Sequence, residues 1–284
     1  MDDPKYKPAL WRLIISRPAS GAYNMAIDEA LLQSVGAGGS PPVLRLYSWI
    51  PPCLSLGYAQ PFSDVDPDKT TKLGWDIVRR MTGGRAILHT DELTYAVIAP
   101  NTEPRLKGGI LESYMRLSQA LLKAVLDLGI PAQASVQTQD FSGNTKPKNP
   151  VCFSVPSKYE ITCQGKKLLG SAQARKKEGI LQHGSLPLKG DLTRILKILK
   201  PGNETEDPQY TLNTRSAMLS KATTMENILG RAPNWEEAAS TFVKAFEDTL
   251  GIAFTQGQPS AEETNLAHEL VKEKYANPTW TMRI

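Results

Sequence analysis

The sequence predicts an α+β fold: a mixed, largely antiparallel sheet flanked by helices, which we expect on one side of the sheet. Segments with apolar residues at helical spacing and short strand-like segments follow one another without regular strand–helix–strand alternation. Tight turns between neighbouring strands indicate antiparallel pairing. No segment is a convincing linker, so we expect one catalytic-type domain over residues 1–284, with a helical C-terminal part from about 235 to 284.

The first half of the chain begins with a predicted helix over 24–35, where apolar residues recur at helical spacing. A second, longer amphipathic helix is expected over 109–128, and Gly129 and Pro131 end it. Between these helices the pattern predicts short strands at 43–47, 53–56, 76–79, 85–89 and 93–98.

The second half contains a predicted hairpin that turns at Gln164–Gly165, with one strand over 159–163. Further along the chain we expect strands over 170–174 and 179–188, a short helix over 191–199, a polar loop over 203–213, and helices over 235–250 and 261–275.

The composition is that of a soluble globular protein, with 40% hydrophobic and 22% charged residues. No apolar run approaches the roughly twenty residues that span a bilayer. Lys and Arg exceed Asp and Glu by only four (33 against 29), which is too few to indicate nucleic-acid binding. Three cysteines without metal-type spacing and a polar, acidic N-terminus favour a cytoplasmic protein without a metal site.

Cys152 is the candidate nucleophile because it follows a segment rich in turn residues rather than lying within an apolar strand. Lys167 lies on the far side of the predicted hairpin, where its ammonium group could return beside the sulfur. A nearby cation favours the thiolate, the form of cysteine that takes part in acyl transfer. Cys53 and Cys163 lie in apolar or strand-like segments, and we expect both to be inert.

A second informative stretch runs from Arg79 to His89 and contains the adjacent residues Gly83 and Gly84. Two glycines between strands allow the backbone to approach a ligand closely, although on spacing alone such a pair is more often only a turn. The basic residues around it and around Lys167 are either solvated surface or a rim suited to an acidic protein partner.

Several motifs, in the same order along nearly the whole chain, resemble the biotin/lipoate protein ligase superfamily. They are the stretches 24–31, 44–52, 79–89, 167–172, 181–186 and 274–280. The resemblance implies the fold of that superfamily. It also implies a substrate site that includes Arg80, Gly83, Gly84, His89, Gly170, Ser171, His183 and Gly184. Whether His89 and His183 act as bases or only form structural hydrogen bonds stays open.

The residues around Cys152 are most similar to the LipM branch of octanoyltransferases. This resemblance implies transfer of octanoyl from octanoyl-acyl carrier protein, through a Cys152 thioester, to a lysine of the glycine cleavage H protein or a lipoyl domain. Lys167 would favour the thiolate, no cofactor would be needed, and neither nucleic acid nor membrane would be a partner. Backbone N–H groups near Gly83–Gly84 or Gly170–Ser171 could stabilise the oxyanion. Two alternatives stay open: an ATP-dependent lipoate or biotin ligase, and a non-catalytic accessory protein that binds acyl groups or lipoyl domains.

Overall fold

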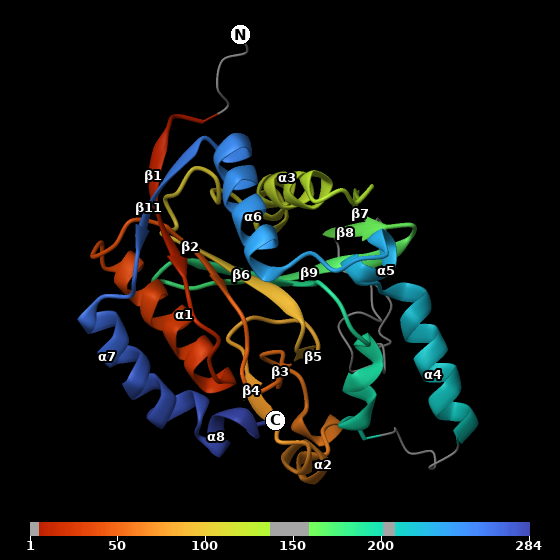
Figure 1. Cartoon of the computed structure of the whole chain (residues 1–284). Coiled ribbons are helices and arrows are strands. Elements are labelled where there is room, and N and C mark those ends of the chain that lie inside the picture. The colour runs from red at the N-terminus through yellow and green to blue at the C-terminus, as the bar shows by residue number, and fades with distance from the viewer. Residues whose placement is uncertain (1–5, 137–158, 201–207) are drawn as a thin grey trace.

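The computed structural model describes residues 6–136, 159–200 and 208–284 of the chain (Figure 1). Cys152 and the turn-rich segment that precedes it lie outside the described residues. The hairpin that carries Lys167 lies within them.

The main sheet has eight strands in the order β11-β1-β2-β6-β10-β9-β8-β7. β1 pairs in parallel with both β2 and β11, and the other pairs of this sheet are antiparallel, so the predicted mixed, largely antiparallel sheet is confirmed. The strands are β1 (Ala9–Ile15), β2 (Val43–Tyr47), β6 (Glu92–Ala99), β7 (Gln133–Val136), β8 (Tyr159–Cys163), β9 (Lys166–Arg175), β10 (Ile180–Pro187) and β11 (Ile252–Gly257).

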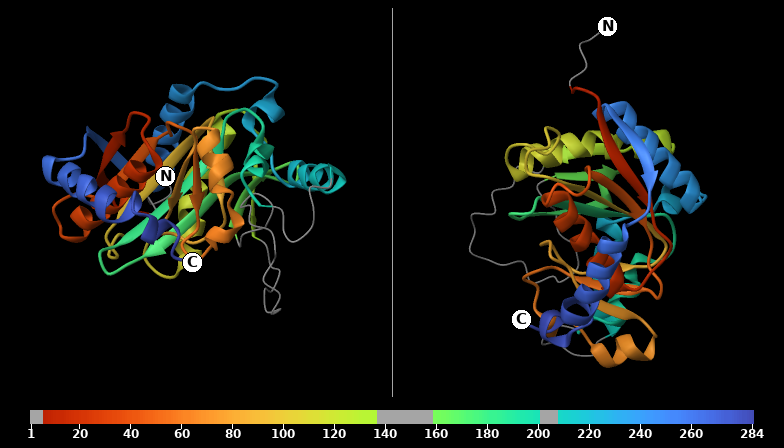
Figure 2. Two further views of the ribbon diagram at one scale, coloured as in Figure 1. Left: turned by 90° about the horizontal axis from the view of Figure 1, so that it is seen from below. Right: turned by 90° about the vertical axis from the view of Figure 1, so that its left-hand side faces the viewer.

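A second sheet of three strands has the order β4-β3-β5. It consists of β3 (Cys53–Leu56), β4 (Asp76–Arg79) and β5 (Ile87–His89). The C-terminal end of the chain lies beside this small sheet and the short helix α2 (Pro67–Lys72) in each view (Figures 1 and 2). There the backbone N–H of Phe62 donates to the carbonyl oxygen of Ile284.

Helices cover both faces of the main sheet, so the prediction of helices on one side is wrong (Figure 1). α3 (Ile110–Asp127) and α6 (Trp235–Leu250) pack on one face, whereas α1 (Gly21–Gly36) and α7 (Ala261–Leu270) pack on the other. The physical reason is visible in the central strand β6, in which every residue is buried. A strand that is covered on both faces buries successive side chains, so buried and exposed positions do not alternate along it.

Several other elements also differ from the prediction. α4 (Pro208–Lys221) begins inside the predicted loop over 203–213. The helix predicted over 191–199 is a 3₁₀ helix, η3 (Leu192–Lys197), for which Asp191 is the N-cap. β1, β7 and β11 were not predicted, and β11 interrupts the C-terminal part that was expected to be helical. The remaining short helices are η1 (Phe62–Asp64), α5 (Met225–Leu229), the π-helical turn η4 (Val271–Tyr275) and α8 (Pro278–Thr281).

The predicted hairpin between β8 and β9 is confirmed. Gln164 and Gly165 both have positive φ (52° and 73°), as a two-residue turn of the hairpin type requires. The β8–β9 register shifts by one residue between Ile161 and Thr162, beside Lys167. No helix among the described residues has the length and apolar character that crossing a membrane would need.

Candidate active site

One pocket lies where strands of the main sheet meet the small sheet and the loop after β4. Seven of the eight residues that we predicted for substrate binding line it, and Gly83 neighbours one of them. The lining residues are Tyr47, Trp49, Arg80, Gly84, Ile87, His89, Thr94, Gly170, Ser171, Ala172, His183, Gly184 and Ser185. The glycine motif and the Gly170–Ser171 motif, which are far apart in the sequence, therefore face a common space.

His89 is held on both sides of its ring. Its Nδ1 lies 2.5 Å from Glu92 Oε1, and its Nε2 lies 2.6 Å from Ser55 Oγ. The ring also stacks on the indole of Trp49, with 4.0 Å between the ring centres. Burial acts to raise the pKa of Glu92, but the neighbouring His89 and several hydrogen bonds outweigh it and hold that pKa below its usual value. Both nitrogens of His89 are therefore occupied by the protein.

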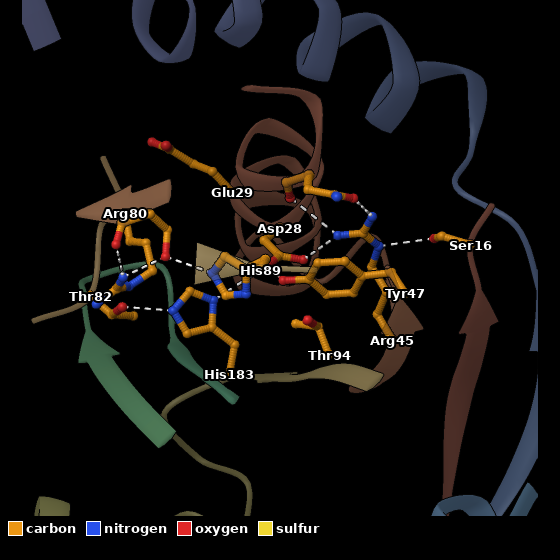
Figure 3. Close-up of polar contacts among 12 residues, drawn as sticks. Ser16, Asp28, Glu29, Arg45, Tyr47, Arg80, Thr82, His89, Thr94 and His183 are labelled. Atoms are coloured by element: carbon orange, nitrogen blue, oxygen red, sulfur yellow. Dashed lines mark hydrogen bonds and ion pairs between the residues drawn. The ribbon is translucent and has the colours of Figure 1, made fainter. Parts of the chain in front are cut away.

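His183 joins the pocket to α1 (Figure 3). Its Nε2 lies 2.7 Å from Thr82 Oγ1, and its Nδ1 lies 3.6 Å from Asp28 Oδ2. Burial lowers the pKa of His183, which favours the neutral imidazole. Asp28 is itself buried and forms an ion pair with Arg45 (2.7 Å). Burial acts to raise the pKa of Asp28, but Arg45 and His183 outweigh it, so that pKa is lowered and the carboxylate stays ionised.

Arg80 is buried, and its guanidinium donates hydrogen bonds to other groups of the protein. Nη1 donates to the carbonyl oxygen and the hydroxyl of Ser55, at 2.7 and 2.6 Å. Nη2 donates to the carbonyl oxygens of Gly83 and Arg85, at 3.0 and 3.1 Å. The structure thus places Arg80 at the wall of the pocket, with four hydrogen bonds directed into the protein.

Position 184 requires a glycine because neighbouring atoms leave no room for a side chain, and not because of its backbone conformation. It lies on β10 between Tyr95 on β6 and Ser171 on β9. A Cβ atom at this position would lie 2.6 Å from the Tyr95 ring and 2.8 Å from Ser171 Oγ. The Tyr95 hydroxyl and Ser171 Oγ are 2.7 Å apart. Burial raises the pKa of Tyr95 to about 12, so its hydroxyl keeps its proton.

Lys167 forms a buried ion pair with Glu160 that we did not predict. Lys167 Nζ lies 2.8 Å from Glu160 Oε1, and each side chain is only 5% exposed. Ile161 packs in the core under α3 and α6, so its neighbour Glu160 points to the opposite face of the sheet, and Lys167 joins it there. This pair could have been predicted from a pattern on two neighbouring strands. Glu160 directly precedes the inward-facing Ile161, and Lys167 lies on the next strand.

The other two cysteines are buried and free, as expected for inert residues. Burial raises the pKa of the thiol of Cys163, and it raises that of Cys53 well above its usual value. Both thiols therefore resist ionisation. Among the described residues, no group of three or more His, Cys, Asp or Glu side chains could hold a metal ion.

The fold and this site define a class of protein. Residues 20–247 match the lipoyl protein ligase A/B catalytic domain, and the chain belongs to this family. Its relatives include the octanoyltransferase LipM of Carboxydothermus hydrogenoformans, which is 37% identical over 276 residues and matches over 96% of this chain and 98% of its own length. The octanoyltransferase LipM of Moorella thermoacetica is 38% identical over 278 residues, with the same coverage.

Solved structures of lipoate protein ligases share the fold. The ligase of the bipartite archaeal lipoylation system from Thermoplasma acidophilum superposes with a TM-score of 0.76 at 23% identity, over 96% of both chains. A lipoate-protein ligase A bound with ATP superposes with a TM-score of 0.75 at 24% identity, over 96% of this chain and 98% of its own.

Proposed function

We propose that the protein is an octanoyltransferase of lipoate biosynthesis. The observation that carries the proposal is the similarity of almost the whole chain to octanoyltransferases LipM, at 36–38% identity. The pocket supports it, because seven of the residues that the family motifs supply face a common space beside β9, the strand that also carries Lys167. The three cysteines, without a disulfide pattern, support a cytoplasmic location.

In the first half-reaction, the thiolate of Cys152 attacks the carbonyl carbon of the thioester in octanoyl-acyl carrier protein. The C–S bond to the carrier breaks, and the carrier thiolate leaves and takes up a proton. In the second half-reaction, the neutral ε-amine of an acceptor lysine attacks the octanoyl-Cys152 thioester. The amine loses a proton to solvent, which balances the proton taken up by the carrier in the first half-reaction. The amide forms, and the Cys152 thiolate is released. The acceptor is a lipoyl domain or the glycine cleavage H protein.

This chemistry needs no nucleotide, because the donor is already an activated thioester and the amide product is more stable. Lys167 supports the thiolate with its positive charge, and Glu160 fixes the position of that charge through the 2.8 Å ion pair. The proposed steps use no metal and no bound cofactor.

The first experiment locates the acyl group. Incubation with octanoyl-acyl carrier protein, followed by peptide mass spectrometry, is expected to find one octanoyl group on a hydroxylamine-labile peptide that contains Cys152. Cys152→Ala should lose both the label and turnover. The matched variants Cys53→Ala and Cys163→Ala should keep both, because those thiols are buried and resist ionisation. Full transfer by Cys152→Ala would exclude the thioester mechanism.

A second candidate function is ATP-dependent lipoate ligation, which is favoured by the similarity of the fold to a lipoate-protein ligase A bound with ATP. The two candidates differ in the donor. Transfer from octanoyl-acyl carrier protein should proceed without ATP or Mg²⁺, and free octanoate or lipoate with ATP should give no product. ATP-dependent attachment of free lipoate would assign the chain to the ligases, and activity with neither donor would favour an accessory role.

A further inference from the structure

The loop after β4, residues 80–85, is fastened to the protein through its carbonyl groups; we call it the glycine loop. Arg80 Nη2 donates to the carbonyl oxygens of Gly83 and Arg85. The carbonyl of Gly84 faces Gly57 so closely that a Cβ atom there would lie 1.9 Å from the oxygen. A guanidinium can only donate hydrogen bonds. Because Arg80 is 3% exposed and has these acceptors, its interactions shape the loop.

The N–H groups of the same loop point the other way. In a trans peptide the C=O and N–H bonds are opposed, so the Gly84 N–H points away from the Arg80 guanidinium that binds the Gly83 carbonyl. Within the part of the chain that the structure describes, the N–H groups of Gly83 and Gly84 have no hydrogen-bond partner. Gly84 lines the pocket, and its φ of +90° is a conformation that favours glycine.

His183 fastens the glycine loop at a second point (Figure 3). The ionised carboxylate of Asp28 can only accept, so Nδ1 of a neutral His183 carries the hydrogen and faces it. Nε2 is then an acceptor, and the Thr82 hydroxyl donates to it at 2.7 Å. His183 therefore holds Thr82, two residues before Gly84, and has no free nitrogen to act as a base.

We propose that Arg80 and His183 are positioning residues, which hold the glycine loop so that the N–H of Gly84 donates a hydrogen bond to the acyl carbonyl oxygen during transfer. The inference rests on the proposed function and changes the role predicted for Arg80 and His183 from contact with the substrate to support of the loop. A preorganised N–H group aimed at the oxygen on which negative charge develops lowers the barrier to acyl transfer.

The decisive variant is Arg80→Lys, which keeps the charge but loses the planar group that reaches two carbonyls. If Arg80 supports an oxyanion donor, kcat for octanoyl transfer should fall about 100-fold, the loss typical for one donor, while KM changes less than about threefold. The matched control is Arg105→Lys, at a buried arginine that binds the carbonyls of Lys7, Leu250 and Gly251 outside the pocket. It should lower Tm without this loss of kcat. An Arg80→Lys enzyme with nearly normal kcat would refute the role of Arg80.

Thr82 provides an independent test of the His183 contact. Thr82→Val keeps the shape but removes the hydroxyl that donates to His183, and kcat should fall roughly tenfold, about 1.4 kcal/mol in the barrier. Thr82→Ser restores the hydroxyl and should restore most of kcat. The control Thr70→Val removes a buried hydroxyl of α2 that donates to the backbone carbonyl oxygen of Asp66, the N-cap of that helix. This contact lies away from the pocket, so the variant should leave kcat unchanged. Equal activity of Thr82→Val and Thr82→Ser would refute the role of His183.

Amide hydrogen exchange separates this inference from the proposed function, because it needs no substrate. Peptides that cover residues 80–90 should exchange at least about tenfold faster in Arg80→Lys and Thr82→Val than in wild type, Arg105→Lys or Thr70→Val, since loss of these hydrogen bonds makes local opening easier. Unchanged exchange would refute the inference even if the wild type transfers octanoyl. Failure of the wild type to transfer octanoyl, with faster exchange in both variants, would refute the proposed function while leaving the loop support intact.

Discussion

At the scale of single residues, the ion pair between Lys167 and Glu160 bears on the activating role that we propose for Lys167. A long lysine side chain has many conformations, and an exposed one would place its charge poorly. The carboxylate at 2.8 Å in a buried setting fixes the ammonium in one place. Glu160 offsets part of the Lys167 charge, so in the proposed mechanism the position of Lys167 matters as much as its charge.

The test of this role compares two neighbouring lysines. Lys167→Met should slow alkylation of Cys152 at neutral pH, with recovery as rising pH ionises the thiol without help. Lys166 lies beside Lys167 on β9 but is half-buried and pairs opposite Cys163, so Lys166→Met should leave the alkylation rate within about twofold of wild type, as expected for a distant charge. Identical alkylation profiles for Lys167→Met and wild type would mean that another group activates the sulfur.

The sequence predicted which residues meet at the pocket, but not how each one is used. The family motifs named Arg80, Gly84, His89 and His183 for one substrate site, and all four line the pocket, although their contact with substrate stays a prediction. It could not show that the guanidinium of Arg80 turns inward to backbone carbonyls, because those acceptors arise only when β3 and the glycine loop pack together. Glu160 was part of a motif, yet its partner depends on the β8–β9 register, which a one-residue bulge alters.

At the scale of elements, α1 and β2 are joined by a buried polar network. Arg45 on β2 donates to Asp28, to the side-chain oxygen of Asn24 and to the backbone carbonyl of Asn24. The Tyr47 hydroxyl also donates to Asp28, at 2.9 Å. Such a network is stable only when all of its members are present, because each charge is shielded from water.

Removal of one charge from this network should therefore be costly. Asp28→Asn leaves Arg45 buried without its anion, and the free energy of unfolding should fall by about 3–5 kcal/mol. The matched control is Asp127→Asn, which breaks a largely exposed pair with Lys123 and should cost less than about 1 kcal/mol. Urea unfolding monitored by circular dichroism measures both. If Asp28→Asn lowers the free energy of unfolding by less than about 1 kcal/mol, the ion pair does not stabilise the contact between α1 and β2.

The same carboxylate makes stability depend on pH in a defined direction. The pKa of Asp28 is lower in the folded protein than in the unfolded chain, so its contribution is fully present above the unfolded value. It is lost as pH falls below about 4 and through the folded pKa. Between neutral pH and pH 3, wild type should lose more stability than Asp28→Asn. Parallel curves of unfolding free energy against pH would contradict this assignment.

Elements with a local signal were predicted well, and those defined by distant partners were not. The predicted 109–128 helix agrees closely with α3, because its apolar stripe and the Gly129 stop are local features. β1 and β11 were missed because they pair with each other in parallel across most of the chain, and no turn marks them. β11 is also largely exposed, so it lacks the apolar alternation that signals a strand.

At the scale of the whole molecule, residues of α8 contact strand β4 of the small sheet next to the pocket. Arg79 on β4 is fully buried, and its guanidinium donates twice to the carbonyl oxygen of Thr281, at 3.0 and 2.7 Å. Trp280 donates from its indole N–H to the Arg79 carbonyl. The residue before the glycine loop is therefore held by α8, and the C-terminus supports the site.

Deletion of residues 277–284 should test that support. Arg79 would lose two charge-assisted hydrogen bonds, each worth about 1.5–3 kcal/mol. At roughly 2–4 °C per kcal/mol for a chain of this size, Tm should fall by at least about 6 °C. Met282→Ala changes only an exposed side chain of the same segment and is the control. If the truncated protein has the same Tm as wild type, Arg79 must donate its hydrogen bonds to other acceptors.

The parallel pairing of β1 with β11 also bears on the order in which the molecule is made. Ala9 lies opposite Ile252, so one edge of β1 has no partner until β11 (Ile252–Gly257) has been synthesised. An open strand edge invites pairing with other molecules, and contacts this distant in sequence form slowly. Arg12 lies in the middle of β1 and meets Glu263 only when the last helices arrive. A charged side chain in the middle of an edge strand disfavours pairing of that edge with other molecules, so Arg12 is expected to have this effect before Glu263 neutralises it.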